Sequence, residues 1–328
     1  MRKVAMVIVG GIAMAVGLFF WSGGRIITIE YEDFPQNEPE KLRPPEKGTF
    51  GELIFTGPLK FEARSRWTQW AMRLFPGHFM VDAKVDSRKV TLLVDTGAAL
   101  TVLSPKVATA AHASLMAVGP EITHWQQKIP TYLGYVQELE ISGLKAYHVP
   151  VLILGKQPVL KLLGLPVYRV DGLLGMSLME KLAVTLDWRT GTVTFHREPL
   201  SLEVPSAPLR LFEQELHGFK ILSPIVDGFL DEAGPYMILI DTGASPAEIL
   251  VSDELLEALG WKGRVLVRHL KLGEIELKDV PAIPAREREA TGVKLKGPVM
   301  LIGGGFFQAQ GIKRLTLDFL GGKLYAER

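Results

Sequence analysis

One seven-residue sequence motif occurs twice in this chain and limits its possible folds more than any other feature. The first copy is Leu-Leu-Val-Asp-Thr-Gly-Ala at residues 92–98, and the second is Ile-Leu-Ile-Asp-Thr-Gly-Ala at residues 238–244. Each copy joins an apolar run typical of a buried β-strand to an acid, a small hydroxyl residue and a glycine typical of a tight turn. The chain therefore predicts two carboxylates, each carried out of a buried strand into a turn.

The similarity between the two halves continues on both sides of this motif. In each half, two strands form a predicted hairpin that delivers the acid, and further strands follow in the same order. The matched segments are 79–85 and 221–226, 90–94 and 236–240, 101–104 and 249–252, 139–141 and 270–272, 149–150 and 280–281, 173–175 and 301–303, and 184–188 and 314–319. We interpret the chain as an internal duplication with two lobes.

The length of 328 residues and a hydrophobic content of 47% are sufficient for two globular units with real cores. A stretch with two prolines and small polar residues separates the halves, and a Pro-, Glu- and Lys-rich stretch precedes the first. We predict an anchor at 1–24, an extended linker at 25–48, a first lobe at 49–200, an interlobe linker at 201–208 and a second lobe at 209–328.

The chain begins with Met1-Arg2-Lys3, followed by an uncharged, nearly all-apolar run of 18 residues at 4–21. This run is long enough to cross a bilayer as a helix. Aromatic residues at 19–21 occupy the place where a signal peptide needs small residues, so we favour an uncleaved anchor over a cleaved signal peptide. Positive residues before the run and acids after it predict a cytoplasmic amino terminus and extracytoplasmic lobes at the cell membrane.

Composition excludes several classes of function. The net charge of +1 and the lack of a basic block give no electrostatic footprint for nucleic acid. There is no cysteine, which excludes disulfides and a thiol nucleophile. No histidine pair has helical metal-ligand spacing and no serine lies in a nucleophile elbow. The Gly303-Gly304-Gly305 run lacks the residues of a phosphate loop, so we expect close packing under an active-site turn instead.

The Asp-Thr-Gly-Ala turn, the Thr-Val-Leu that follows it and the later apolar-apolar-Gly resemble the retropepsin and pepsin clan of aspartic proteases. The resemblance covers about residues 79–328. It implies a mostly all-β, two-lobed pepsin/retropepsin-like fold, here preceded by one transmembrane helix. It also implies that Asp95 and Asp241 form the catalytic pair and that Thr96 and Thr242 tie the two turns together as support.

The chemistry requires these residue types without any appeal to family. Two carboxyls placed face to face share one proton, which supplies an acid and a base for the attack of water on a peptide bond with no metal or cofactor. Gly97 and Gly243 remove side chains where each turn approaches the opposing acid.

Ala98 and Ala244 stand where pepsin-like enzymes commonly carry a hydroxyl, so no hydroxyl donor at these positions lowers the pKa of the acids. We therefore expect activity toward neutral pH.

The first half carries a longer connection than the second, because 44 positions separate Asp95 from Leu139 and only 29 separate Asp241 from Leu270. In the resembling clan this place holds a β-hairpin flap that closes over the substrate. We predict the flap within 122–141, with Tyr132 and Tyr135 near its tip and Gly134 as a hinge. The alternative is a long surface loop.

Taken together, these features predict a membrane-anchored aspartic endopeptidase that acts on extended peptide or protein substrates. A monomer is expected, because both acids are present in one chain. Two alternatives stay open: a catalytically silent relative that only binds peptides in the interlobe cleft, and a structural module of an envelope assembly.

Overall fold

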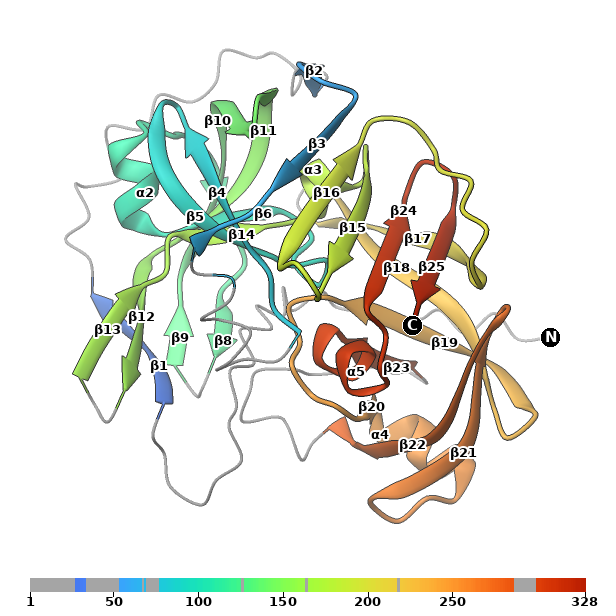
Figure 1. Ribbon diagram of the computed structural model, residues 1–328. Helices are drawn as coiled ribbons and strands as arrows, with labels where there is room; N and C mark the ends of the chain where they lie inside the picture. The colour runs from blue at the N-terminus through green and yellow to red at the C-terminus, as the bar shows by residue number, and fades with distance from the viewer. Residues whose placement is uncertain are drawn as a thin grey trace.

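The structure is a computed structural model that describes residues 27–33, 53–66, 68, 77–124, 127–162, 165–216, 219–285 and 299–328 (Figure 1). The predicted anchor at 1–24 lies outside these residues. Within the described ranges, no helix has both the length and the apolar character needed to cross a membrane.

The first lobe is built on an eight-stranded sheet of order β2-β11-β6-β14-β5-β4-β10-β7. Its strands are β2 (Ile54–Thr56), β4 (Met80–Val85), β5 (Arg88–Val94), β6 (Thr101–Leu103), β7 (Ser114–Val118), β10 (Thr131–Ile141), β11 (Leu144–Leu154) and β14 (Gly172–Leu174). The predicted hairpin is present as β4 and β5, with a turn at Asp86 and Ser87. Both turn residues have positive φ, 43° and 70°, as a two-residue hairpin turn requires.

The second lobe repeats this plan within a twelve-stranded sheet of order β19-β23-β20-β22-β21-β18-β17-β25-β24-β15-β16-β3. Its own strands are β17 (Ser206–Leu216), β18 (Phe219–Leu230), β19 (Ala233–Asp241), β20 (Ile249–Val251), β21 (Val265–Leu272), β22 (Ile275–Pro284), β23 (Val299–Gly303), β24 (Arg314–Asp318) and β25 (Lys323–Glu327). The strands predicted at 221–226 and 236–240 are longer in the structure. Both strands continue to a two-residue turn at Asp231 and Glu232, whose φ values are 45° and 75°.

A short strand and a helix follow each acid, and both helices begin in the same way. Helix α2 (Pro105–Ala110) follows β6, and helix α4 (Asp253–Leu259) follows β20. Ser104 and Ser252 cap them, since each side-chain oxygen accepts a hydrogen bond from the backbone N–H three residues later. The serines that end the matched segments 101–104 and 249–252 are therefore helix caps.

The closing hairpins of the two halves join the lobes in one sheet (Figure 1). In the first half the hairpin is β15 (Ala183–Asp187) and β16 (Thr192–His196), and in the second it is β24 and β25. Strand β15 pairs with β24, β3 (Lys60–Ala63) pairs with β16, and β17 pairs with β25. Each hairpin therefore covers an edge of the other, which leaves fewer unpaired backbone groups at the junction.

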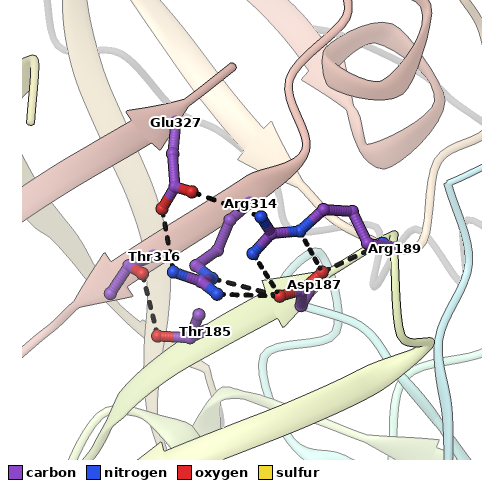
Figure 2. A network of polar contacts seen from close by, with 6 residues as sticks. All are labelled: Thr185, Asp187, Arg189, Arg314, Thr316 and Glu327. Carbon is purple, nitrogen blue, oxygen red and sulfur yellow. Dashed lines mark hydrogen bonds and ion pairs between the residues drawn. The ribbon is translucent and has the colours of Figure 1, made fainter.

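A polar network holds this junction together (Figure 2). The Thr185 and Thr316 hydroxyl oxygens lie 2.8 Å apart across β15 and β24. Asp187 accepts hydrogen bonds from Arg189 and Arg314, and Arg314 also donates to Glu327. Partial burial alone would raise the pKa of Asp187, but the bonds from both arginines lower it to about 2. The carboxylate is therefore charged and paired throughout the physiological range.

Two small additions extend the first lobe, and β1 comes from the predicted linker. Strand β1 (Ile27–Asp33) pairs with β12 (Lys156–Leu162), which pairs with β13 (Leu165–Arg169). Strands β8 (Ile122–His124) and β9 (Gln127–Ile129) form a separate hairpin. The segment 25–48 thus contributes a strand to the lobe. The predicted interlobe linker at 201–208 likewise ends in β17, where Ser206 pairs with Tyr325.

Candidate active site

The two acids emerge at equivalent places in the two lobes. Asp95 follows β5 directly, and its N–H donates to the carbonyl of Leu174 in β14 at 3.0 Å. Asp241 ends β19 and pairs with Gly303 in β23. Both β14 and β23 run parallel to the acid-bearing strand beside them. The apolar-apolar-Gly segments therefore lie directly against the acid strands.

Each carboxyl lies against the glycine of the opposing turn. A methyl group built on Gly97 would lie 2.5 Å from the carboxyl carbon of Asp241, and one built on Gly243 would lie 2.4 Å from that of Asp95. No side chain fits at either distance, so both positions require glycine. Asp95 and Asp241 are 0% and 2% exposed. The fold thus brings two acids, 146 positions apart in the chain, into one buried pair.

Backbone N–H groups supply most of the hydrogen bonds to these carboxyls. Oδ1 of Asp95 accepts from Gly97 at 2.8 Å and from Ala98 at 3.2 Å, and Oδ1 of Asp241 accepts from Gly243 at 2.9 Å. The methyl groups of Ala98 and Ala244 are buried in apolar clusters. Oδ2 of Asp95 is buried, and no N–H or O–H group of the described residues donates to it. If Oδ2 carried a proton, it would become an O–H donor and would no longer be an acceptor without a partner.

The two threonines join the turns through four reciprocal hydrogen bonds. The N–H groups of Thr96 and Thr242 each donate to the hydroxyl oxygen of the other at 3.0 Å. The Thr96 hydroxyl then donates to the carbonyl of Ile240 at 2.7 Å, and the Thr242 hydroxyl to that of Val94 at 3.0 Å. Every one of these bonds crosses from one lobe to the other. Because all the groups are buried, the network fixes the separation of the acids.

Burial and mutual proximity perturb the titration of both acids. Burial first, and then the neighbouring charge of Asp241, raise the pKa of Asp95 well above its usual value. Burial raises the pKa of Asp241 to about 6, while a hydrogen bond from Asp95 and backbone N–H groups oppose the rise. Both pKa values are raised, so the pair holds a shared proton to higher pH than an isolated aspartate would.

The glycine run at 303–305 packs under the second turn, as expected. A methyl group on Gly303 would lie 2.2 Å from the carbonyl oxygen of Ala244, and one on Gly305 would lie 2.0 Å from that of Ser245. This run leads into α5 (Gly304–Ala309). In the first lobe, α3 (Met176–Met179) holds the equivalent place after β14. These contacts explain the glycines by close packing of backbones.

The predicted flap residues lie elsewhere than expected. Tyr132, Gly134 and Tyr135 belong to the long strand β10, which pairs with both β11 and β7, and not to a hairpin tip. A methyl group on Gly134 would lie 2.2 Å from the carbonyl oxygen of Ser114, so strand packing accounts for this glycine. The hairpin in this region is formed by β8 and β9, in which Ile122 pairs with Ile129. Local turn residues around Pro130 were misleading because long-range pairing continues the strand.

One residue at the site carries no sequence signal. His78 is 1% exposed, and its Nε2 lies 2.6 Å from the carbonyl oxygen of Gly243 in the second turn. It lies two positions before the start of β4 and belongs to no motif. Only the contact between lobes reveals it.

With this geometry established, the chain can be compared with known proteins. Residues 81–178 match the family model for aspartyl proteases. The match begins in β4, contains Asp95 and ends in α3, so it supports an aspartic protease family through the first lobe. No curated protein matches the chain.

Two solved structures are similar to the chain at low identity. A retropepsin-like aspartic protease from Rickettsia conorii has 18% identity and a TM-score of 0.27, with 44% of this chain and 94% of that chain covered. Basic 7S globulin from soybean has 10% identity and a TM-score of 0.40, with 84% of this chain and 94% of that chain covered.

Proposed function

We propose that this chain is an aspartic endopeptidase whose Asp95 and Asp241 share one proton and activate water. The observation that carries this proposal is the buried carboxyl pair, in which each acid is packed against the glycine of the opposing turn. The aspartyl protease match over residues 81–178 supports the same class of reaction. Extended peptides are the proposed substrates, and one chain supplies both acids.

The chemical step follows from the two protonation states. Ionised Asp241 takes a proton from water while protonated Asp95 gives its proton to the carbonyl oxygen of the peptide bond, and the water oxygen bonds to the carbonyl carbon. In the second step, Asp241 returns its proton to the nitrogen, Asp95 takes a hydroxyl proton, and the carbon–nitrogen bond breaks. Both carboxyls thus return to their starting states, and products are an acid and an amine.

The direct test is cleavage of a mixed peptide library by the full chain in detergent micelles. New peptide termini should appear with the native chain and be absent with Asp241→Asn. Peptide binding without new termini would favour the silent, peptide-binding alternative. Fractionation of cells expressing the full chain tests the anchor proposed at residues 1–24, because a chain recovered without the membrane fraction would contradict it.

Cleavage is expected to persist toward neutral pH. Below the pKa of Asp241, about 6, both acids are protonated and no base is present, whereas above the raised pKa of Asp95 no acid is present. The value of kcat/KM should therefore rise with pH up to around 6, stay high toward neutral pH, and fall once the pH passes the raised pKa of Asp95. Ala98→Ser adds a donor near the pair and should move the profile to lower pH. An unmoved profile, or activity only in strong acid, would refute this reasoning.

The β8–β9 hairpin is our proposed lid. Ile122 and Ile129 belong to the same buried apolar cluster as Ala98 and Leu100, which follow Asp95. A lid that closes over an extended peptide should become less mobile when the cleft is filled. Hydrogen exchange across 119–130 should slow when a transition-state-like peptide is bound. Protection that appears instead at 261–276 would place the lid on the second lobe.

A further inference from the structure

The threonine and glycine contacts of the dyad are symmetric, but one side-chain contact is not. The threonine bonds and the glycine contacts of one turn are matched by those of the other. The bond from His78 to Gly243 has no such match. Met80 pairs with Leu93 and Ile225 pairs with Leu239, so strand register makes Ser223 the equivalent of His78. Among the described residues, no side chain donates to the carbonyl of Gly97, the equivalent acceptor.

The geometry fixes which atom of His78 carries a hydrogen. A carbonyl oxygen can only accept, so Nε2 must donate across the 2.6 Å separation. The backbone beside His78 is equally constrained. Gly77 has a φ of 89°, and a methyl group there would lie 2.1 Å from the N atom of Gly305. The imidazole is therefore held by a segment that packs directly on the glycine run under the second turn.

The carbonyl that His78 contacts belongs to the peptide unit between Gly243 and Ala244. The N–H of the same unit, that of Ala244, points toward Asp241: it donates to the backbone carbonyl of Asp241 at 3.1 Å, and its proximity to the carboxyl favours the ionised form. Hydrogen bonding at the carbonyl end polarises a peptide unit and makes its N–H a stronger donor. In the first turn, the N–H of Ala98 also donates to Asp95, at 3.2 Å, but without a side-chain donor behind it.

We propose that His78 is a positioning residue that holds the peptide between Gly243 and Ala244 and thereby makes Asp241, and not Asp95, the carboxyl that releases its proton first. This inference rests on the proposed function, because it assigns the two carboxyls their roles in that reaction. It acts through the peptide and not on substrate. Among the described residues, the titratable side chains that the contacts above bring together are Asp95, Asp241 and His78, and the start of α5 packs here through glycine backbone.

Two substitutions in the full chain distinguish loss of the hydrogen-bond donor of His78 from loss of its imidazole ring. His78→Leu removes the donor and should lower kcat on the order of ten- to a hundredfold with KM close to native, since a small misplacement of a reacting group has effects of this size. It should also move the acid limb of kcat/KM to higher pH, because ionised Asp241 loses stabilisation. His78→Gln keeps an N–H donor near the Nε2 position and should restore kcat and the profile. The exposed His269→Leu, in β21 and without a positive φ, is the matched control and should behave as native.

A native pH profile in His78→Leu, or a His78→Gln chain as impaired as His78→Leu, would overturn the proposal. Direct detection does not depend on turnover or on the variants folding. In native chain labelled with ¹⁵N and ¹³C, Nε2 of His78 should be protonated and show scalar coupling to the carbonyl carbon of Gly243. If that coupling is present and Asp241 titrates below Asp95 while no peptide is cleaved, the proposed function fails and this inference stands. If Asp95 titrates first, the inference fails.

Discussion

Asp95→Asn is expected to reduce peptide cleavage by at least about a thousandfold, which is the scale of general acid–base catalysis lost with its group. An amide has nearly the shape of a carboxyl but cannot pass a proton to the substrate oxygen. Asp241→Asn should have an equal effect, because that variant lacks the base that takes a proton from water. The measurement is single-turnover cleavage of a peptide selected from the library.

The Asp95→Asn variant should still fold, and its free energy of unfolding should depend less on pH than that of the native chain. The raised pKa of Asp95 means that the folded chain binds this proton more tightly than the unfolded chain does. The folded state therefore loses stability as pH rises above about 4, the ordinary aspartate pKa. The amide of the Asp95→Asn variant cannot ionise, so its melting temperature relative to that of the native chain should increase between about pH 4 and pH 7.

Asp171→Asn is the matched control for loss of a carboxylate. Asp171 is also a first-lobe acid beside β14, but it accepts a hydrogen bond from the N–H of Thr91 at 2.9 Å and takes no part in the dyad. Its substitution should leave turnover close to native. Substantial turnover in Asp95→Asn, or a loss in Asp171→Asn as large as in the dyad variants, would refute the assignment of the pair.

Gly243→Ala is expected to abolish cleavage and lower stability together. Its new methyl group would lie 2.4 Å from the carboxyl carbon of Asp95, a distance that no pair of carbon atoms tolerates without movement. Either the acid or the turn must shift, and both are held by buried hydrogen bonds. Overpacking of this kind costs about 1–3 kcal/mol. Gly97→Ala should act in the same way on Asp241, and urea unfolding together with cleavage rates would measure both effects.

Gly260→Ala gives the baseline for losing a glycine. Gly260 ends α4 with a φ of 67°, and a methyl group there meets nothing within 4 Å. We expect a cost of about 1 kcal/mol from backbone strain and no change in turnover. If Gly243→Ala cleaved peptides as fast as Gly260→Ala, the close approach of the turn to Asp95 would not be required for activity.

Much of the architecture could be predicted because its signals are local. An apolar run followed by Asp-Thr-Gly specifies a buried strand and a turn within a few residues, and it does so twice. Ser104 and Ser252 end matched segments because each caps the helix that follows it. The glycine run was correctly assigned to close packing, since no phosphate-binding residues accompany it.

Predictions failed where pairing partners lie far apart in the chain. The strands predicted at 221–226 and 236–240 were too short, because β18 continues to Leu230, where Phe229 and Leu230 pair with β21. The flap tip was misplaced because β10 continues through Tyr132 and Gly134 to pair with β7 and β11. Local turn propensity was overridden by long-range pairing in both cases.

The sequence by itself determined that two equivalent acids end two buried strands, since strand, turn and acid are encoded within each copy of the seven-residue motif. Only the tertiary structure decided that β15 and β24 join the lobes and that His78 reaches Gly243. The physical reason is that these contacts form between surfaces of different lobes. Periodicity and turn chemistry describe a residue's near neighbours in the chain, whereas the asymmetry of the dyad depends on a neighbour 165 positions away.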